Sequence, residues 1–306
     1  MAEFKRPSGS AYERVGLFRK MARTILPNDV TTRIRLSGSF TDSVDSILRD
    51  HDVAVEAAYT TERGANVAVA RTIAAPDGTF DIVLDAGNLL DAEANSQADR
   101  RHRTRSIRHT AAHEPQHVLL HLARTDGEYY REDIICARTP RAYRKNLAEA
   151  LDEYRCELAA NRIAPSATSR ESVFVRDLSS MREAINGVRA LVETDIDRAL
   201  YVTMTAACQM FKALAYLAAE YVVAGREPEP PQPLSPGWDR YLQQLWPDVL
   251  RLLRGVPAAD EPCTHDLLTS TLAALCVRFS QWMHEVGIRY ENREDGQECY
   301  WDHQVY

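Results

Sequence analysis

The stretch RHTAAHEPQHVLLH, residues 108–121, decides how the rest of the chain is interpreted. It places His113, Glu114 and His117 in the pattern H-E-x-x-H, within a segment predicted to be helical from about 106 to 123. On a helix, residues four apart share one face, with Cβ atoms about 5–6 Å apart. Two imidazoles placed in this way can bind one Zn²⁺ at about 2.0–2.1 Å. Glu114 lies about 100° round the helix, where a general base is needed to take a proton from the attacking water.

A catalytic zinc needs a third protein ligand and one open position. His121 lies two turns from His113, about 12 Å along the axis, and is too distant to share one metal. The predicted second helix offers Glu157, and Glu153 one turn earlier is the alternative ligand. Asn161, one turn after Glu157, is a candidate to hold a ligand through a hydrogen bond.

Both segments resemble those of the ImmA/IrrE-type zinc metallopeptidases. RHTAAHEPQHVLLH is similar to R-F-T-x-A-H-E-x-x-H-x-x-L-H, and ELAANRIAP is similar to E-x-x-A-N-x-F-A before a proline. The resemblance covers about residues 79–166. It implies that His113, His117 and Glu157 bind one zinc per chain and that Glu114 is the base of a gluzincin-like peptidase. It also implies a cytosolic protein substrate, a helix-turn-helix repressor, cleaved in a stress or phage-defence response.

The chain departs from the family pattern at two places. His109 stands where the family has phenylalanine, and Pro115, followed by glutamine, stands where the family has leucine and glycine. Proline removes the hydrogen bond to the carbonyl of Ala111 and can kink a helix. The bond from the His117 amide to the His113 carbonyl does not involve Pro115, so the turn that spaces the two histidines can survive.

Two further features of the site stay open at the level of sequence. Cys136 lies between the two predicted metal-binding helices, and a thiolate is an excellent zinc ligand. It is a candidate inhibitory fourth ligand, against the alternative of an ordinary cysteine. Several side chains near the motif are candidate donors to the oxyanion of a peptidase transition state: Tyr129, Tyr130, Tyr143, Arg155 and His109.

The remaining pattern predicts an α+β fold with three parts. Short segments rich in β-forming residues, separated by turn sequences, predict a small antiparallel sheet: 53–59, 66–73 and 79–85. A second metal-binding helix is predicted at about 140–163, and the chain from about 175 onward is helical apart from a proline-rich linker. The expected parts are an N-terminal helical segment (1–50), a zincin-like metallopeptidase core (51–168) and an all-helical C-terminal regulatory or docking region (169–306) with the linker at 226–237.

Composition favours a cytoplasmic globular protein. The formal net charge is -7, 45% of the residues are hydrophobic, and the six cysteines form no CxxC pair. The cysteine pattern fits reduced thiols. The acidic net charge is not that of a general nucleic-acid binder, although it leaves local basic patches open. The N-terminus lacks an apolar signal-peptide core. The most apolar stretch is interrupted by Lys212 and Glu220, which favours a buried helix over a membrane span.

A local basic run precedes the motif. The segment 100–109 holds five arginines, which suggest a nucleic-acid activator: Arg100, Arg101, Arg103, Arg105 and Arg108. The alternative is a solvated segment whose charges offset an acidic protein.

The sequence therefore favours a zinc-dependent endopeptidase that cleaves a specific cytosolic regulatory protein. A second hypothesis is a non-catalytic regulator that keeps the zincin fold and binds nucleic acid or a protein partner. A third is a structural zinc site without turnover.

Overall fold

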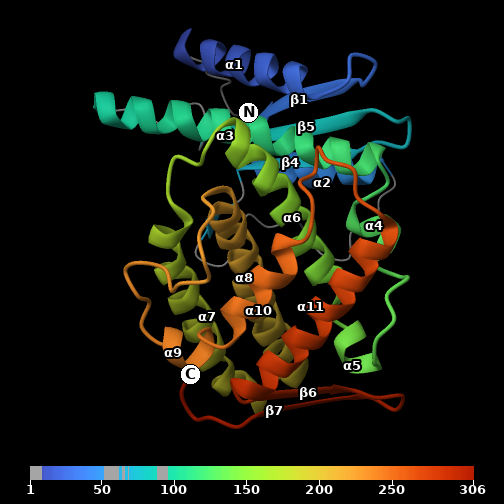
Figure 1. The fold of residues 1–306 in the computed structure, drawn as a ribbon, viewed down its shortest axis with the longest axis vertical. Helices are drawn as coiled ribbons and strands as arrows, with labels where there is room; N and C mark the ends of the chain where they lie inside the picture. The colour runs from blue at the N-terminus through green and yellow to red at the C-terminus, as the bar shows by residue number, and fades with distance from the viewer. Residues whose placement is uncertain (1–8, 52–61, 64–65, 68, 88–95) are drawn as a thin grey trace. The chain divides into compact units, whose positions relative to one another are not determined.

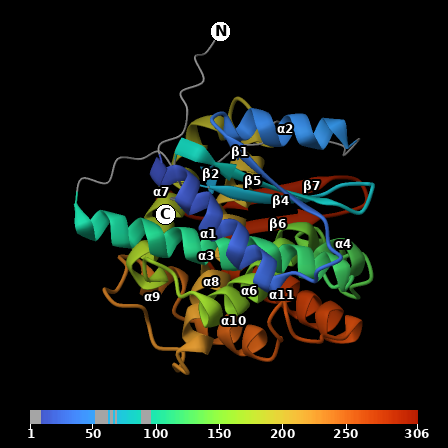
Figure 2. The ribbon, with the colours of Figure 1, turned by 90° about the horizontal axis from the view of Figure 1, so that it is seen from above.

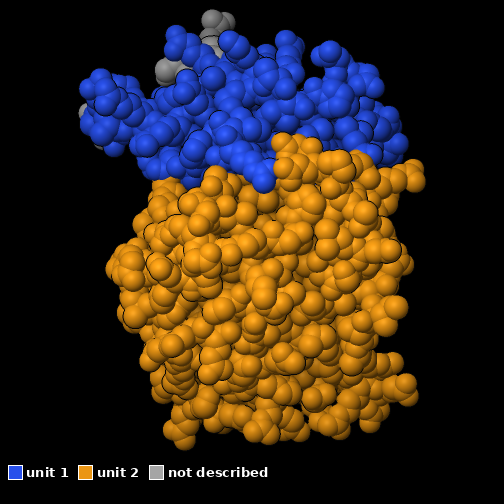
Figure 3. Space-filling model, viewed as in Figure 1, with its two compact units in different colours: residues 1–62, 67–122, 159–167 blue, residues 63–66, 123–158, 168–306 orange. Residues whose placement is uncertain are grey.

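The computed structural model describes residues 9–51, 62–63, 66–67, 69–87 and 96–306 (Figure 1). The chain divides into two compact units, coloured separately in Figure 3. Unit 1 comprises residues 1–62, 67–122 and 159–167, and unit 2 comprises residues 63–66, 123–158 and 168–306. These bounds differ from the expected ones, because the N-terminal helices belong to the same unit as the motif helix and residues 123–158 belong to the helical unit.

Unit 1 contains a three-stranded sheet in the order β1-β5-β4. Strand β1 (Thr32–Ser37) runs parallel to β5 (Phe80–Asp85), and β4 (Ala70–Ala74) runs antiparallel to it. The prediction of a small sheet is confirmed, but the sheet is mixed rather than antiparallel because the unforeseen strand β1 joins it. The predicted strand 53–59 lies outside the described residues. The predicted strand 66–73 is divided between β4 and β3 (Asn66–Val67), which pairs with β2 (Glu62–Arg63).

Helices cover both faces of this sheet (Figure 2). Ile82 and Leu84 of β5 pack against α1 (Gly9–Ile25) and α3 (Gln97–Leu122). Val83, which points to the opposite face, packs against α2 (Phe40–Asp50). The alternation follows from the two-residue period of a strand. Helix α2 lies within the predicted N-terminal helical segment, 1–50.

A buried carboxylate fixes the position of β1. Asp81 of β5 is fully buried, and its oxygens accept hydrogen bonds from Arg33 and Arg35 of β1 at 2.6–3.3 Å. His51, just after α2, lies 3.1 Å from the same carboxylate. Burial raises the pKa of Asp81, but the hydrogen bonds from Arg35, His51 and Arg33 outweigh this effect and hold it below its ordinary value. The ionic contacts join β1, β5 and the end of α2.

Helix α3 is continuous through Pro115. It begins at Gln97, about nine residues before the predicted start, and ends at Leu122. Its apolar face, including Ile107, Ala111 and Val118, is buried against α1 and the sheet. The proline therefore does not end the helix that carries the motif.

Unit 2 is mainly helical, as predicted. The elements that follow α3 are α4 (Gly127–Tyr130), α5 (Arg138–Arg141), α6 (Arg144–Ile163), α7 (Arg170–Val192), α8 (Ile196–Val223), α9 (Trp238–Tyr241), α10 (Leu245–Arg254) and α11 (His265–Glu285). The C-terminal region also contains an antiparallel hairpin, β6 (Ile288–Asn292) and β7 (Gln297–Trp301), so it is not all-helical. The predicted linker 226–237 contains no helix or strand.

Helix α8 is the central helix of this unit. It lies beside α7 and α10 (Figure 1), and Phe211 packs edge-on against Phe279 of α11 with ring centroids 5.4 Å apart. It is the one described helix that is long and apolar enough to cross a membrane by length and composition, and 56% of that stretch is buried among its neighbours. These properties fit the core helix predicted from the sequence.

Helix α6 begins in unit 2, and from Ala159 onward it belongs to unit 1. Near its middle, Asp152 accepts hydrogen bonds from the Gly127 amide at 2.7 Å and from the Tyr130 hydroxyl at 2.9 Å. A Cβ atom at Gly127 would lie 2.8 Å from the Cβ of Ala148, so this close approach requires glycine. Burial raises the pKa of Asp152 to about 8, although both hydrogen bonds oppose the shift.

We expect Asp152→Asn to remove part of the pH dependence of stability. The folded protein holds a proton on Asp152 up to about pH 8, whereas the unfolded chain releases it near its ordinary pKa of about 3.9. The free energy of unfolding therefore falls as pH rises across this window. In thermal melts, the melting temperature of Asp152→Asn relative to that of the wild type should be higher at pH 8 than at pH 5. Glu149→Gln, an exposed change on the same helix, should follow the wild type. The same change of melting temperature with pH in all three proteins would contradict the conclusion that Asp152 is protonated in the folded protein.

Candidate metal centre

The two motif histidines face each other across one turn of α3. Their Nε2 atoms lie 3.3 Å apart, and their ring centroids are 5.1 Å apart. Two nitrogens bound to one zinc at about 2.0–2.1 Å, with a tetrahedral angle between them, lie about 3.3–3.4 Å apart. The spacing of His113 and His117 therefore fits a shared zinc ion, and it equally fits a hydrogen bond between one protonated and one unprotonated ring.

The donor set around these histidines also suits a metal. Groups of histidine and glutamate side chains that could hold a metal ion occur among the described residues, and His113 and His117 both take part in them. Imidazole and carboxylate are the ligands of gluzincin-type zinc sites.

Glu114 is directed at the sheet. It is buried, and its Oε2 accepts a hydrogen bond from the Thr72 hydroxyl at 2.8 Å. Thr72 lies in the middle of β4, an edge strand of the described three-stranded sheet. The carboxylate predicted to act as the base is thus oriented by a residue that the sequence analysis did not identify. No spacing rule links Thr72 to the motif, because it lies 42 residues earlier on another element.

Two further histidines of α3 have structural contacts within unit 1. His109 Nδ1 lies 2.9 Å from the carbonyl oxygen of Ala164, just after α6. A carbonyl only accepts, so Nδ1 carries the proton in a neutral ring and Nε2 does not. The ring centroid of His109 lies 6.2 Å from that of His113. His121 packs edge-on against Phe80 at 5.6 Å, two turns beyond His113.

Glu157 has a counter-ion within unit 2. Its side chain is fully buried, and Arg170 at the start of α7 donates two hydrogen bonds to Oε1, from Nε at 3.1 Å and Nη2 at 2.8 Å. The guanidinium lies over the ring of Tyr216 at 4.5 Å. Glutamate at this position was predicted as a zinc ligand, but the arginine that neutralises it was not foreseen.

Glu153, the alternative ligand, is held on both oxygens. Lys212 contacts Oε1 at 2.6 Å, and the Tyr216 hydroxyl donates to Oε2 at 2.7 Å. Burial is the main reason that the pKa of Tyr216 lies well above its ordinary value, and the Glu153 charge adds to it. Asn161 is also buried, and its Oδ1 accepts a hydrogen bond from the Ser166 amide at 3.2 Å, which ties the chain after α6 to the helix.

The surroundings of Cys136 disfavour a thiolate. Burial raises the pKa of its thiol, and the positive charges of Arg141 and Arg144 oppose this shift without cancelling it. The inhibitory-ligand hypothesis for Cys136 stays an expectation.

Three of the candidate oxyanion donors are engaged elsewhere. Tyr130 is fully buried against Asp152, and Tyr143 packs edge-on against Phe279 in the core of unit 2. Arg155 is fully buried and donates to the carbonyl oxygens of Thr125 and Pro257. Of the five candidates, Tyr129 is the one with an exposed side chain.

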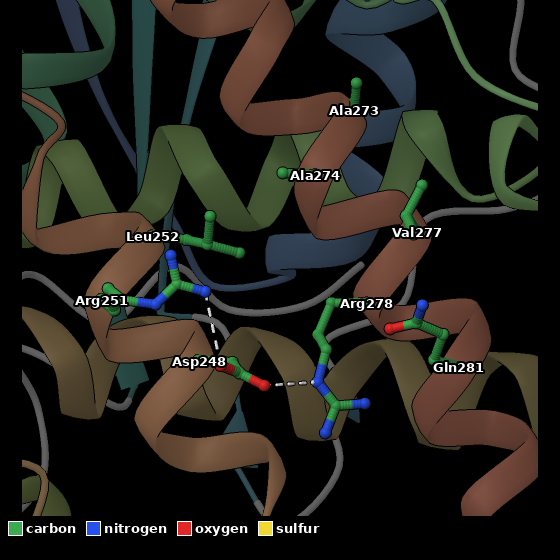
Figure 4. A pocket seen from close by; sticks show the side chains of 8 residues that line it. All are labelled: Asp248, Arg251, Leu252, Ala273, Ala274, Val277, Arg278 and Gln281. Atoms are coloured by element: carbon green, nitrogen blue, oxygen red, sulfur yellow. Dashed lines mark hydrogen bonds and ion pairs between the residues drawn. The ribbon is translucent and has the colours of Figure 1, made fainter.

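A shallow pocket lies apart from these residues, between α10 and α11 (Figure 4). Its volume is about 410 Å³, and Ala273, Ala274 and Val277 form its apolar side. Arg278, the buried cation at its edge, is paired with Asp248 and Glu285 at 2.9 Å. The pocket therefore shows no unsatisfied charge that would select a ligand.

Comparisons with protein-family models, with curated proteins and with solved structures found no match to this chain.

We expect Thr72→Val to destabilise the protein by about 1.5 kcal/mol, the usual contribution of a hydrogen bond to a charged group. Thr72→Ser keeps the hydroxyl and should cost less. Urea unfolding measures both changes. The Thr72 hydroxyl also lies 3.1 Å from the main-chain carbonyl oxygen of residue 114, which Glu114→Ala keeps. In that background the difference between valine and serine should shrink but not vanish, and an undiminished difference would show that the carboxylate is not the main partner of Thr72.

Proposed function

We propose that this chain is a zinc-dependent endopeptidase of the ImmA/IrrE type, with a zincin-like core. His113, His117 and Glu157 bind one zinc ion, and Glu114 is the general base. The observation that carries the proposal is the 3.3 Å separation of the His113 and His117 Nε2 atoms, which equals the spacing of two ligands on a tetrahedral zinc.

Glu157 is favoured over Glu153 as the third ligand. A metal bound at Glu153 would compete with the Lys212 ammonium on one oxygen and the Tyr216 hydroxyl on the other. Arg170 directs both of its hydrogen bonds to one oxygen of Glu157. Glu157 also lies two helical turns before Ala164, whose carbonyl accepts from His109 of α3.

Each protein group has a separate task in the proposed reaction. A zinc ion, when bound, polarises the scissile carbonyl and lowers the pKa of a water molecule. The Glu114 carboxylate takes the proton from the attacking water and returns it to the leaving amine. Thr72 keeps the carboxylate in the required orientation. An extended substrate can pair with the edge strand β4, which would orient the scissile bond through main-chain hydrogen bonds.

The proposed substrate is a specific cytoplasmic regulatory protein, a helix-turn-helix repressor in a stress or phage-defence response. This part of the proposal is supported by the resemblance of the two motifs alone. The geometry of α3 and β4 supports peptide hydrolysis as a reaction class but does not select a sequence.

The second candidate function is that of a non-catalytic regulator that keeps this fold. It is favoured by the fact that every charge in the candidate site has a possible protein partner. His113 and His117 are at hydrogen-bond distance, and Arg170 neutralises Glu157. Such a protein would bind no zinc under native conditions.

Elemental analysis of metal per chain tests the proposed ligands. We expect about one zinc in the wild type, and its loss in His113→Ala, His117→Ala and Glu157→Ala. Glu153→Ala and His121→Ala are matched controls that should keep zinc. His109→Phe, which introduces the family residue, should also keep it. A wild type without zinc after reconstitution would favour the regulator.

Cleavage is tested separately on the zinc-loaded protein with a mixed library of quenched fluorogenic peptides. We expect turnover that Glu114→Gln abolishes without loss of zinc, because this variant removes the base and keeps the ligands. Turnover that is unchanged in Glu114→Gln, or zinc binding with no turnover in the wild type, would contradict the peptidase assignment.

We expect Arg170→Ala to destabilise the metal-free protein by about 3 kcal/mol, because it leaves a buried carboxylate without its counter-ion. Glu157→Gln in the same background should recover most of this loss. If Glu157 binds zinc, added zinc should stabilise Arg170→Ala more than the wild type. Urea unfolding with and without zinc measures these effects, with the exposed Arg176→Ala as the control. If zinc stabilises both proteins equally, Arg170 and the metal do not compete for Glu157.

A further inference from the structure

The arginines of α3 form a stripe along one side of the helix. Arg101, Arg105 and Arg108 are all exposed, and their spacing of four and three residues places them within about 60° of one another around the axis. They span about 10 Å along a rigid helix. The sequence predicted a helix from about residue 106, whereas the structure places Arg101 and Arg105 as well as Arg108 on the motif helix itself.

A second group of exposed cations lies on the neighbouring helix. Helix α1 packs against α3 through Val15 and Phe18, and its last two turns carry Arg19, Lys20 and Arg23. Helices α1 and α3 each have a net charge of +3, whereas the whole chain has -7, so the rest of the chain carries -13. Positive charge is therefore concentrated on two helices of unit 1.

Several exposed arginines of unit 2 have a carboxylate partner. Arg289 and Arg293 are each paired with one at 2.8–3.0 Å. Within the described part of the chain, the structure shows no ion pair for the cations of the two helices named above: Arg19, Lys20, Arg23, Arg100, Arg101, Arg105 and Arg108.

We propose that the α3 stripe, extended by the cations of α1, binds the phosphate backbone of a double-stranded nucleic acid without base specificity. A duplex presents one negative charge for about every 1.7 Å of its axis, which matches a linear array of cations. Single-strand binding uses aromatic stacking platforms, and residues 97–112 contain no phenylalanine, tyrosine or tryptophan. An anionic membrane would favour exposed apolar residues beside the cations, and none of the exposed large hydrophobic residues lies between 97 and 121.

The surface is independent of zinc, so it is compatible with either function above. The stripe ends at Arg108 and the motif begins at His113, about 7.5 Å further along the same helix. At 100° per residue, His113 and His117 lie about 80–180° round the helix from these arginines, so a bound duplex would lie on another side of α3 and leave the motif face open.

Fluorescence anisotropy of the full chain with a labelled duplex of about 20 base pairs tests the proposal across a series of salt concentrations. We expect binding that weakens linearly in log Kd against log salt. The triple variant Arg101→Gln, Arg105→Gln, Arg108→Gln should weaken binding at least about tenfold and reduce the slope by about 3, because each phosphate contact contributes about 0.9. The triple variant of Arg19, Lys20 and Arg23 to glutamine should have a smaller effect of the same kind.

The matched control is Arg251→Gln, Arg289→Gln, Arg293→Gln, which removes the same charge from unit 2. It should leave affinity and slope unchanged, and circular dichroism melts check that all variants are folded. No salt-dependent binding by the wild type, or equal weakening in the control, would overturn the proposal. Tighter binding of a single strand than of the duplex would also overturn it. Duplex DNA and duplex RNA are compared as separate arms, and zinc content measured in parallel keeps this result distinct from the peptidase test.

Discussion

The turn of α3 from His113 to His117 determines the geometry on which the candidate metal centre depends. Proline inside a helix costs about 3 kcal/mol, because it loses one hydrogen bond and its ring crowds the preceding turn. Here the lost bond is the one from residue 115 to the carbonyl of Ala111, and the bond from the His117 amide to the His113 carbonyl does not involve Pro115. Burial of a large aliphatic side chain contributes about 1.5–3 kcal/mol, and α3 buries Ile107, Val118 and Leu120. Tertiary packing therefore outweighs the proline, and the helix stays continuous.

The sequence predicted those elements whose apolar periodicity and end signals lie within their own residues. Helix α6 has apolar periodicity within its own residues, and its range agrees closely with the predicted 140–163. Strand β1, TRIRLS, was missed because its exposed arginines resemble a loop. Its stability comes from Asp81, 46–48 residues away. The β6–β7 hairpin did have a local signal, the Asp-Gly pair at 295–296, which marks turns between strands.

The candidate site shows the same division between local and distant information. Helical spacing alone predicts that His113 and His117 face a common point, and their 3.3 Å separation agrees with it. Thr72 and Arg170 could not be predicted in this way, because each reaches its glutamate from a different element. Residues that orient a carboxylate follow from the packing of strands and helices, which no motif records.

Three neighbouring carboxylates of α6 show how the fold tolerates buried acid. Asp152 keeps its proton because burial raises its pKa to about 8, Glu153 is paired with Lys212, and Glu157 is paired with Arg170. A buried charge is costly unless it is neutralised or paired. Because all three costs are offset within the protein, α6 needs no metal to be stable. A structural zinc is expected where the ligands would otherwise repel or unfold the chain. The charge compensation of Glu157 therefore argues against a purely structural metal, and it is compatible both with an ion that is recruited for function and with a protein that binds none.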